Sequence, residues 1–292
     1  MFCPELFLTS RRATRSFGIR FILLFTAAIV VGLCEPGEGA YIDEVLNDGP
    51  HGYWRLDEAA GTNAENSGLA GDSLNGAYGG GYTLGVPGAL AKDPNTAVKF
   101  DGNDGIVLIE DAVHPTAYTI ESWVKPATIR GQSIFLRTAG NPNSTWSHQI
   151  RMTQTGTFQA YAFDGNTRSV TGSTIATPGE WYHVVATARN DGLMRLYVNG
   201  AAEGGTTPLD TLWEGGSEYL IGSDSGDGAS AGTIRFFDGT IDETALYLTE
   251  LSSERIQAHY AAGIVPEPGS AALFLTSITL LLLMCRPHTF LR

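Results

Sequence analysis

The sequence predicts an all-β protein, built as a two-sheet antiparallel sandwich or jelly roll. Short runs of strand-favouring residues recur about every 8 to 15 residues between residues 41 and 263, with no long run of helical period. Glycine occurs 36 times, which suits a chain with many turns. Over residues 118–125 the side chains alternate as in a half-buried strand. This many short strands in one span favours two packed sheets.

The clearest predicted element is a β-hairpin over residues 181–200. Two strand-like runs flank an Asn-Asp-Gly turn at 190–192, and Asn-Gly at 199–200 closes the second run. Asn and Gly tolerate the positive φ that tight hairpin turns need. His183 stands among aromatic and β-branched residues, so we expect a packed or hydrogen-bonded core histidine. The other predicted strands are 53–56, 97–100, 106–109, 119–125, 134–137, 149–153, 157–163, 168–171, 218–221 and 235–247.

One short helix is predicted, and it begins after Leu251. Ser252 is placed to cap its first turn, and Leu251 and Ile256 stand at the two positions of a hydrophobic staple. Gly263 is expected to end the helix. We expect this helix to cover an edge of the sandwich.

The formal net charge of the chain is −13 at pH 7. An acidic surface repels phosphate backbones, so nucleic-acid binding is not expected, whereas a soluble secreted surface or cation binding is compatible with it. The three cysteines, Cys3, Cys34 and Cys285, all lie in the terminal segments. The predicted domain therefore contains no disulfide, thiol nucleophile or zinc–thiolate site.

The first 40 residues have the organisation of a secretory signal peptide. Four arginines between positions 11 and 20 precede an apolar run over 21–33, and small and turn residues follow up to position 40. The apolar run is short for a membrane span. The letters at 10–12 and at 31–34 faintly match a twin-arginine signal and a lipoprotein box, and both alternatives stay open.

The last 29 residues, 264–292, read as a sorting signal with a transmembrane segment over 270–285. An uncharged apolar run over 271–284 precedes Arg286, which is placed to anchor the segment on the cytoplasmic side. The motif before the run consists of Val265, Pro266, Glu267 and Pro268. Motif, span and basic end together resemble the PEP-CTERM sorting signal. That resemblance implies an exosortase-type enzyme, which removes the tail and releases or attaches the protein at the cell surface.

The span 41–263 resembles a laminin-G-like, concanavalin-A-like jelly-roll domain. The pieces that carry the resemblance are 53–58 (YWRLDE), 98–102 (VKFDG), 118–124 (YTIESWV), the hairpin at 181–200, 219–222 (YLIG) and 239–243 (GTIDE). Their order and spacing cover nearly the whole span. The resemblance implies an antiparallel jelly roll and a structural calcium ion near the place where the start and end of the domain meet.

Calcium takes six to eight oxygen ligands, which Asp, Asn and backbone carbonyls in Gly-rich loops supply. The candidate ligands for one structural Ca²⁺ are Asp57, Asn66, Asp101 and Asp242. Each of these residues is also a common solvated turn residue, so both interpretations stay open.

Catalytic motifs find little support in the residues. The letters G-A-S-A-G at 228–232 match a nucleophile elbow but lie in a loop without the strand and helix that this motif needs. A glycosidase needs two carboxylates that flank a sugar bond. Asp242 and Glu243 are adjacent and would face opposite sides of a strand, and Glu121 has no acidic residue two positions away. We therefore expect no enzyme.

A ligand-binding face is predicted where aromatic and polar residues meet. Aromatic rings stack on sugar rings, and Trp146, Tyr161 and Phe163 are the candidates, with the carboxylate of Asp164 beside them. Asn166 and Trp213 are further candidates. The alternative is that these aromatic residues belong to the core.

The sequence as a whole predicts an exported cell-surface protein that binds extracellular polysaccharide or another glycan, or mediates adhesion. Until the C-terminal segment is processed, that segment would anchor the protein in the membrane. The first alternative is a structural matrix or envelope protein without a discrete ligand. The second is a glycoside hydrolase.

Overall fold

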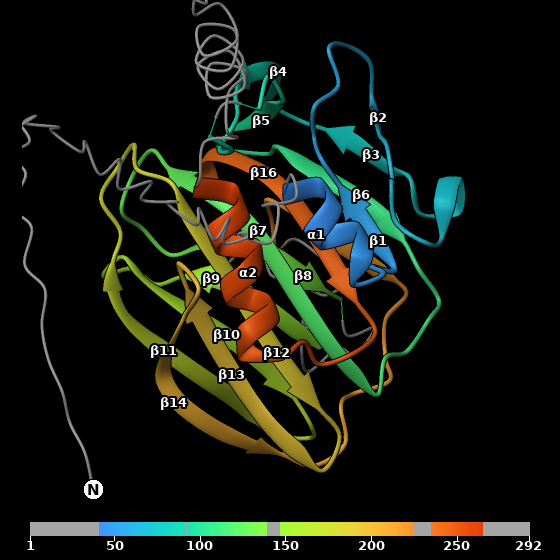
Figure 1. The fold of residues 1–292 in the computed structure, drawn as a ribbon, viewed down its shortest axis with the longest axis vertical. Helices are drawn as coiled ribbons and strands as arrows, with labels where there is room; N and C mark the ends of the chain where they lie inside the picture. The colour runs from blue at the N-terminus through green and yellow to red at the C-terminus, as the bar shows by residue number, and fades with distance from the viewer. Residues whose placement is uncertain (1–40, 92, 139–146, 225–234, 265–292) are drawn as a thin grey trace, which may run out of the picture. The chain divides into compact units, whose positions relative to one another are not determined.

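The computed structural model describes residues 41–91, 93–138, 147–224 and 235–264. They form a sandwich of two antiparallel eight-stranded sheets with helical segments outside it, as Figure 1 shows. The all-β prediction is confirmed. No helix among the described residues is long and apolar enough to span a bilayer. The predicted signal peptide (1–40) and transmembrane segment (270–285) lie outside the described residues.

Sheet A contains the predicted hairpin. Its strand order is β14-β13-β12-β7-β16-β5-β4, and β1 pairs with β16 beside this path. The bounds are β14 (Ala201–Leu209), β13 (Gly192–Val198), β12 (Tyr182–Arg189), β7 (Ala117–Pro126), β16 (Asp238–Tyr247), β5 (Thr96–Asp101), β4 (Tyr82–Pro87) and β1 (Gly52–Trp54).

Sheet B packs against sheet A and has the strand order β11-β10-β9-β8-β15-β6-β3-β2. The bounds are β11 (Thr167–Ile175), β10 (Thr157–Phe163), β9 (His148–Met152), β8 (Gln132–Arg137), β15 (Glu218–Ile221), β6 (Ile106–Glu110), β3 (Gly76–Gly79) and β2 (Asn63–Ala64). Strands of consecutive number are neighbours over most of this sheet, so β8 to β11 form one continuous antiparallel surface.

The hairpin prediction is confirmed in detail. Val184 pairs with Val198 across β12 and β13, and Asp191 takes a φ of 51° in the turn. Asn199 and Gly200 also have positive φ, at 51° and 75°. The turn therefore uses the left-handed conformations that Asn, Asp and Gly adopt at low cost.

Two helices, α1 (Tyr41–Asn47) and α2 (Ser253–Ile264), lie over the outer face of sheet A (Figure 1). The predicted α2 is confirmed, and the amide of Arg255 donates to Oγ of Ser252 at 3.4 Å. It covers a sheet face rather than the expected edge. The prediction of a single helix was wrong, because α1 and a 3₁₀ turn (η1, Gly71–Leu74) are also present.

The apolar core has two parts. The larger part fills the space between the sheets, and the smaller part lies between sheet A and the two helices. Tyr41 and Val45 of α1 and Ile256 of α2 are buried in the smaller part against Trp123 and Tyr247 of sheet A. Both helices are too short to be stable in isolation, and burial of these apolar side chains against sheet A stabilises them.

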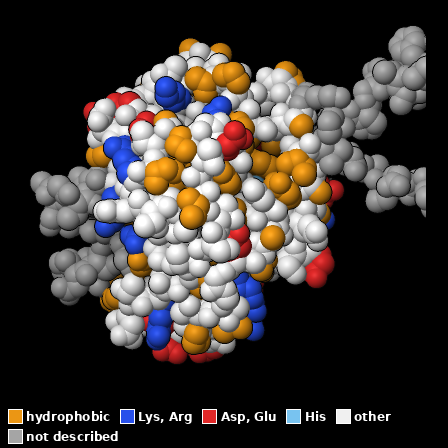
Figure 2. Space-filling model, turned by 90° about the vertical axis from the view of Figure 1, so that its left-hand side faces the viewer, with side chains coloured by type: hydrophobic (Ala, Val, Ile, Leu, Met, Phe, Trp, Pro, Cys, Tyr) orange, Lys and Arg blue, Asp and Glu red, His pale blue; other side chains and the backbone are white. Residues whose placement is uncertain are grey.

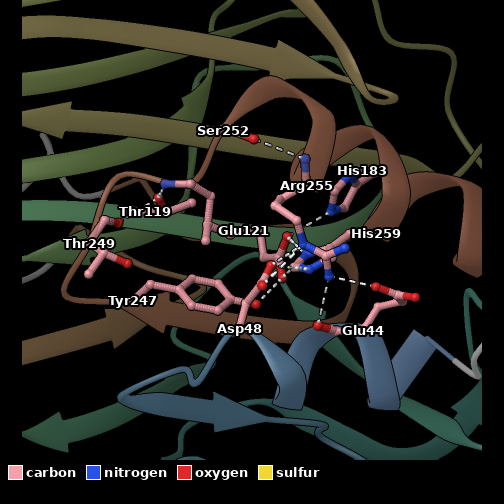
Figure 3. A network of polar contacts seen from close by, with 11 residues as sticks. Glu44, Asp48, Thr119, Glu121, His183, Tyr247, Thr249, Ser252, Arg255 and His259 are labelled. Atoms are coloured by element: carbon pink, nitrogen blue, oxygen red, sulfur yellow. Dashed lines mark hydrogen bonds and ion pairs between the residues drawn. The ribbon is translucent and has the colours of Figure 1, made fainter.

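A buried polar cluster holds both helices to the sheet; we call it the Glu121 clamp (Figure 3). The fully buried carboxylate of Glu121 accepts hydrogen bonds from the Tyr247 hydroxyl at 2.8 Å and from Nε2 of His183 at 3.2 Å. Nδ1 of His259 lies 3.1 Å from the same carboxylate. The expectation of a hydrogen-bonded core histidine at 183 is confirmed.

The clamp continues from sheet A to α1 through His259. Its Nε2 lies 3.0 Å from Oδ2 of Asp48, which also accepts from Arg255 at 2.8 Å. Both ring nitrogens of His259 thus face carboxylates, which only accept, so both nitrogens must donate and the ring is an imidazolium. Burial opposes this charge, but Glu121 outweighs burial and the pKa of His259 is raised. Burial likewise opposes ionisation of Glu121, but the histidines hold its pKa below the usual range.

We predict that His259→Gln lowers the free energy of unfolding by about 3 kcal/mol near neutral pH, because two buried carboxylates lose the cation between them. Since the pKa of His259 is raised in the fold, its stabilising contribution is complete below the unfolded value of about 6.5 and is lost as the pH rises through the folded value. Urea unfolding of the wild type from about pH 6 to about pH 9 should therefore show falling stability, and the variant a flatter profile.

The control is His114→Gln, which changes an exposed histidine and should keep the wild-type profile. A His259→Gln profile that falls as steeply as the wild type would contradict the clamp.

Candidate functional site

The outer face of β8 to β11 carries a line of polar side chains across four strands. The inter-strand register aligns Ser133 with Arg151, Arg151 with Gln159, and Gln159 with Thr171. We call these four residues the polar row. Their side chains point away from the core, because the intervening residues Ile150, Phe158 and Ala160 are buried between the sheets.

Hydrogen bonds order the polar row. Arg151 donates from Nε and Nη2 to Oε1 of Gln159, at 3.1 and 2.9 Å. Nε2 of Gln159 in turn donates to the hydroxyl of Thr171 at 2.6 Å. Thr171 is exposed and Arg151 is half-buried, whereas Gln159 is 9% exposed and Ser133 is fully buried. The row therefore presents oriented donors and acceptors near the β11 edge of sheet B.

Tyr161 lies beside the polar row on the same face of β10. The guanidinium of Arg151 sits 3.9 Å from the centre of its ring and donates a hydrogen bond to its hydroxyl. One face of the ring is thus covered by a cation, which gives the pair a fixed geometry. Tyr161 therefore serves first as a platform for Arg151.

A pocket of about 490 Å³ opens where β10 ends. The ring of Trp213 is 37% exposed and packs edge-on against Phe163, with 5.4 Å between the ring centres. The lining is formed by Asp164, Gly165, Thr211, Leu212, Trp213, Glu214 and Gly215. Its size and mixed lining fall within the range of small-ligand sites.

Asp164 shapes this pocket through its carboxylate. Nε of Arg168 donates to it at 2.8 Å, and the amides of Asn166 and Asp210 donate at 3.1 Å. Burial opposes its ionisation, but the Asp210 amide and Arg168 outweigh burial, and the pKa of Asp164 is lowered. The anion therefore joins the β10–β11 turn to the segment that carries Trp213.

The structure brings most of the predicted ligand residues together. Tyr161 and Phe163 share one face of β10, and Asp164 lines the adjoining pocket with Trp213. Trp146 lies outside the described residues. The sequence analysis missed Arg151 and Gln159. The alternation of β10 was the available signal for Gln159, since it places residues 159, 161 and 163 on one face.

Figure 2 shows the side of the molecule on which the β11 and β14 edges lie. Most of this side is formed by uncharged polar side chains and backbone, and several Lys and Arg side chains gather along its left-hand border. The side is therefore less acidic than a net charge of −13 would suggest.

A second polar cluster, around Asp242 and Glu243, is closed to solvent, because both side chains are fully buried. The expectation that they face opposite sides of a strand was wrong. The register of β16 against β7 shifts between Asp242 and Ala245, and Glu243 adopts a left-handed φ of 48°. This bulge directs both carboxyls to the outer side of sheet A.

The carboxyl groups of this cluster are held by separate partners. Glu243 accepts from Arg55 at 3.2 Å and from Nδ2 of Asn95 at 2.6 Å, and Asp242 accepts from the amide of Ala89 at 2.7 Å. Burial raises the pKa of Glu243 to about 7 and the pKa of Asp242 well above its usual value, the latter also through the neighbouring Glu243. Neither carboxyl lines a cleft that would admit a sugar.

A laminin G family model, described as the concanavalin A-like lectin/glucanases superfamily, matches residues 100–257, which is more than half of the chain. The chain belongs to this superfamily. No curated protein sequence matches the chain. The family assignment agrees with the two antiparallel sheets.

Several solved structures share the fold of this superfamily member. The receptor binding domain of a botulinum neurotoxin mosaic serotype C/D has a TM-score of 0.55 at 15% identity, over 74% of this chain and 51% of that one. The chain thus spans about half the length of the neurotoxin domain. Domain 4 of AbnA, a GH43 extracellular arabinanase from Geobacillus stearothermophilus solved with arabinotriose, has a TM-score of 0.52 at 19% identity, over 72% and 98%. A Trypanosoma rangeli sialidase has 0.53 at 16%, over 73% and 32%.

Two of the four predicted calcium ligands have other roles in the structure. The carboxylate of Asp57 is 41% exposed and lies 3.6 Å from the guanidinium of Arg55. The amide oxygen of Asn66 accepts from the backbone of Tyr53 and Gly68, at 2.7 and 2.9 Å. Both lone pairs of that oxygen are therefore occupied.

The other two predicted ligands lie in different surroundings. Asp101 is exposed and accepts from the amide of Asn103 at 2.8 Å, so it orders its own turn. Asp242 is buried, and its Oδ1 has no hydrogen-bond partner. Within the described ranges no three His, Cys, Asp or Glu residues are grouped to hold a metal ion. The four residues do not fit one calcium site as a set, and calcium at Asp242 stays a prediction.

The calcium prediction is tested by thermal unfolding with and without a chelator. If Oδ1 of Asp242 holds calcium, excess chelator should lower the Tm, because an ion that binds only the folded state stabilises it. Asp242→Asn should remove the sensitivity to chelator, and the matched control Asp57→Asn should keep it. A wild-type Tm that chelator leaves unchanged would rule out calcium.

Proposed function

We propose that the protein is exported to the cell surface and binds extracellular polysaccharide through the outer face of sheet B. The observation that carries this proposal is the ordered polar row beside the aromatic pair Phe163 and Trp213. Sugar hydroxyls hydrogen-bond to amide, hydroxyl and guanidinium groups, and the C–H faces of sugar rings pack on aromatic rings. The polar groups of β9 to β11 and the aromatic pair at the end of β10 offer both kinds of contact side by side.

The family supports the proposal in general terms. The superfamily description names lectins and glucanases. The arabinanase domain of the same fold was solved with arabinotriose, a neutral oligosaccharide. We propose binding rather than hydrolysis, because Glu121, Asp242 and Glu243 are buried away from both the polar row and the pocket. Of the two acids that line the pocket, Asp164 is already held by Arg168 and two backbone amides.

A matrix or envelope protein without a discrete ligand is the alternative in another class. It would use the same exported sandwich as a building block. The terminal segments serve both proposals equally: residues 1–40 would direct export, and 264–292 would be recognised by an exosortase-type enzyme after transient anchoring in the membrane.

Binding is tested with a glycan array probed by the full chain, in the presence and absence of calcium. We expect Trp213→Ala to weaken binding to any glycan that gives a signal by about tenfold or more, because the pocket loses its aromatic wall. Trp181→Ala is the matched control, since Trp181 packs beneath Lys125 of sheet A. It should leave glycan binding unchanged. Silence of the wild type on the array under both conditions would contradict a lectin and favour the matrix protein.

Sorting is tested by the mass of the mature protein from its native envelope. We expect loss of the first 40 residues or so and cleavage near Val265–Pro268, with any attached lipid or sugar visible as added mass. Pro266→Ala combined with Pro268→Ala should retain the tail. A wild-type mature protein that still contains residues 286–292 would contradict exosortase-type processing.

A further inference from the structure

Arg151 brings a positive charge into the middle of the polar row, where its contacts are uncharged. Its guanidinium donates to Oε1 of Gln159 and to the Tyr161 hydroxyl. Nη1 has no hydrogen-bond partner, and no carboxylate lies within ion-pair distance of the group, among the described residues. The cation is therefore ordered but not neutralised.

Other arginines with limited exposure are compensated in other ways. Arg55 and Arg255 each form ion pairs with a carboxylate. Arg130 and Arg137 have no carboxylate in the described ion pairs, but each donates to a backbone carbonyl oxygen. Arg151 has neither kind of partner in the described part of the chain. Its charge, like that of Arg137, is not paired with any carboxylate of the described residues, but Arg137 is fully buried whereas Arg151 is partly exposed to solvent.

The charges nearest to Arg151 cancel each other and leave its own charge uncompensated. Arg235 lies close enough to interact with it electrostatically, and Arg235 is itself paired with Asp224 at 2.7 Å. Arg151, Arg235 and Asp224 together carry one net positive charge. Burial, with a smaller contribution from Arg235, outweighs the opposing effects of Tyr161 and Asp224 and lowers the pKa of Arg151. Keeping the guanidinium protonated here costs free energy that an anionic partner would offset.

The form of the group indicates which anion suits it. A guanidinium offers parallel N–H groups that bind two oxygens of one carboxylate or sulfate, whereas a neutral hydroxyl uses only one of them. Ser133 is fully buried, so the accessible part of the polar row runs from Arg151 on β9 to Thr171 on β11, about 10 Å, which suits a short oligosaccharide.

We infer that the polysaccharide recognised by this face is acidic, and that Arg151 binds a carboxylate or sulfate borne by one of its sugar rings. The inference rests on the proposed function and specifies its ligand class. Gln159 and Thr171 would bind neighbouring hydroxyls. Because the chain carries a net charge of −13, a long polyanion would be repelled by the remaining surface. Binding of short oligosaccharides therefore measures the affinity of the Arg151 site without repulsion from the rest of the surface.

The test is calorimetric titration of the full chain with three trisaccharides. Trigalacturonic acid carries carboxylates, its trimethyl ester has the same rings without charge, and a trigalactoside with sulfate esters carries the alternative oxyanion. We expect at least one acidic sugar to bind about tenfold or more tightly than the ester. The acid that binds identifies whether the oxyanion is a carboxylate or a sulfate.

The variants assign the preference to one residue. Arg151→Gln should remove the preference for acid, so that the acidic sugar and the ester bind with about equal affinity. Arg151→Lys should restore part of it, because the charge returns without the planar fork. Arg189→Gln removes a 60% exposed arginine that is paired with Glu250, and it should change nothing. Thermal unfolding of each variant establishes that it is folded.

Three results would overturn the inference. Equal binding of acid and ester would show that the face recognises neutral sugar, with the proposed function intact. An acid preference that persists in folded Arg151→Gln would place the oxyanion elsewhere. If neither these sugars nor any array glycan binds, the proposed function fails together with the inference.

Discussion

The ionised carboxylate of Glu121 lies in the interior of the protein, where a charge is stable only with hydrogen-bond donors and a countercharge. Tyr247 and His183 supply donors from sheet A, and His259 supplies the countercharge from α2. Because His259 also contacts Asp48, the same cation joins α2 to the end of α1. The first and last described helices of the domain are therefore joined to each other and to sheet A.

Because the Glu121 clamp holds α1 and α2 against sheet A, the outer face of sheet A is not available to a ligand. With α1 and α2 in place, the apolar outer face of β7, β12 and β16 is covered. The outer face of β10 and β11 keeps exposed polar residues, among them Thr171, next to an open pocket with Trp213. One sheet thus provides the framework, and the other sheet provides the candidate binding face. The division follows from where the apolar residues of each strand point.

Sequence patterns correctly predicted the elements that depend only on residues close together in the chain. The turn at 190–192, the strand β7 and the Ser252 cap all depend on residues within a few positions of one another. The expectation that β7 is only half-buried was wrong, because the helices cover its outer face. The helix α1 was missed, because seven residues give little periodicity and its stability comes from packing on sheet A. Strand alternation gave the wrong faces at 242–243, because a bulge changes the direction of the side chains there.

The sequence by itself determined the all-β class, the central hairpin and an aromatic, polar segment around residues 161–164 as a ligand candidate. Only the tertiary structure decided which polar groups become partners. Glu121 meets His259 from 138 positions away, and the strand register places Arg151 beside Gln159 and Tyr161. Such pairings depend on strand order and register, which long-range burial of apolar surface determines and which no short stretch of sequence contains.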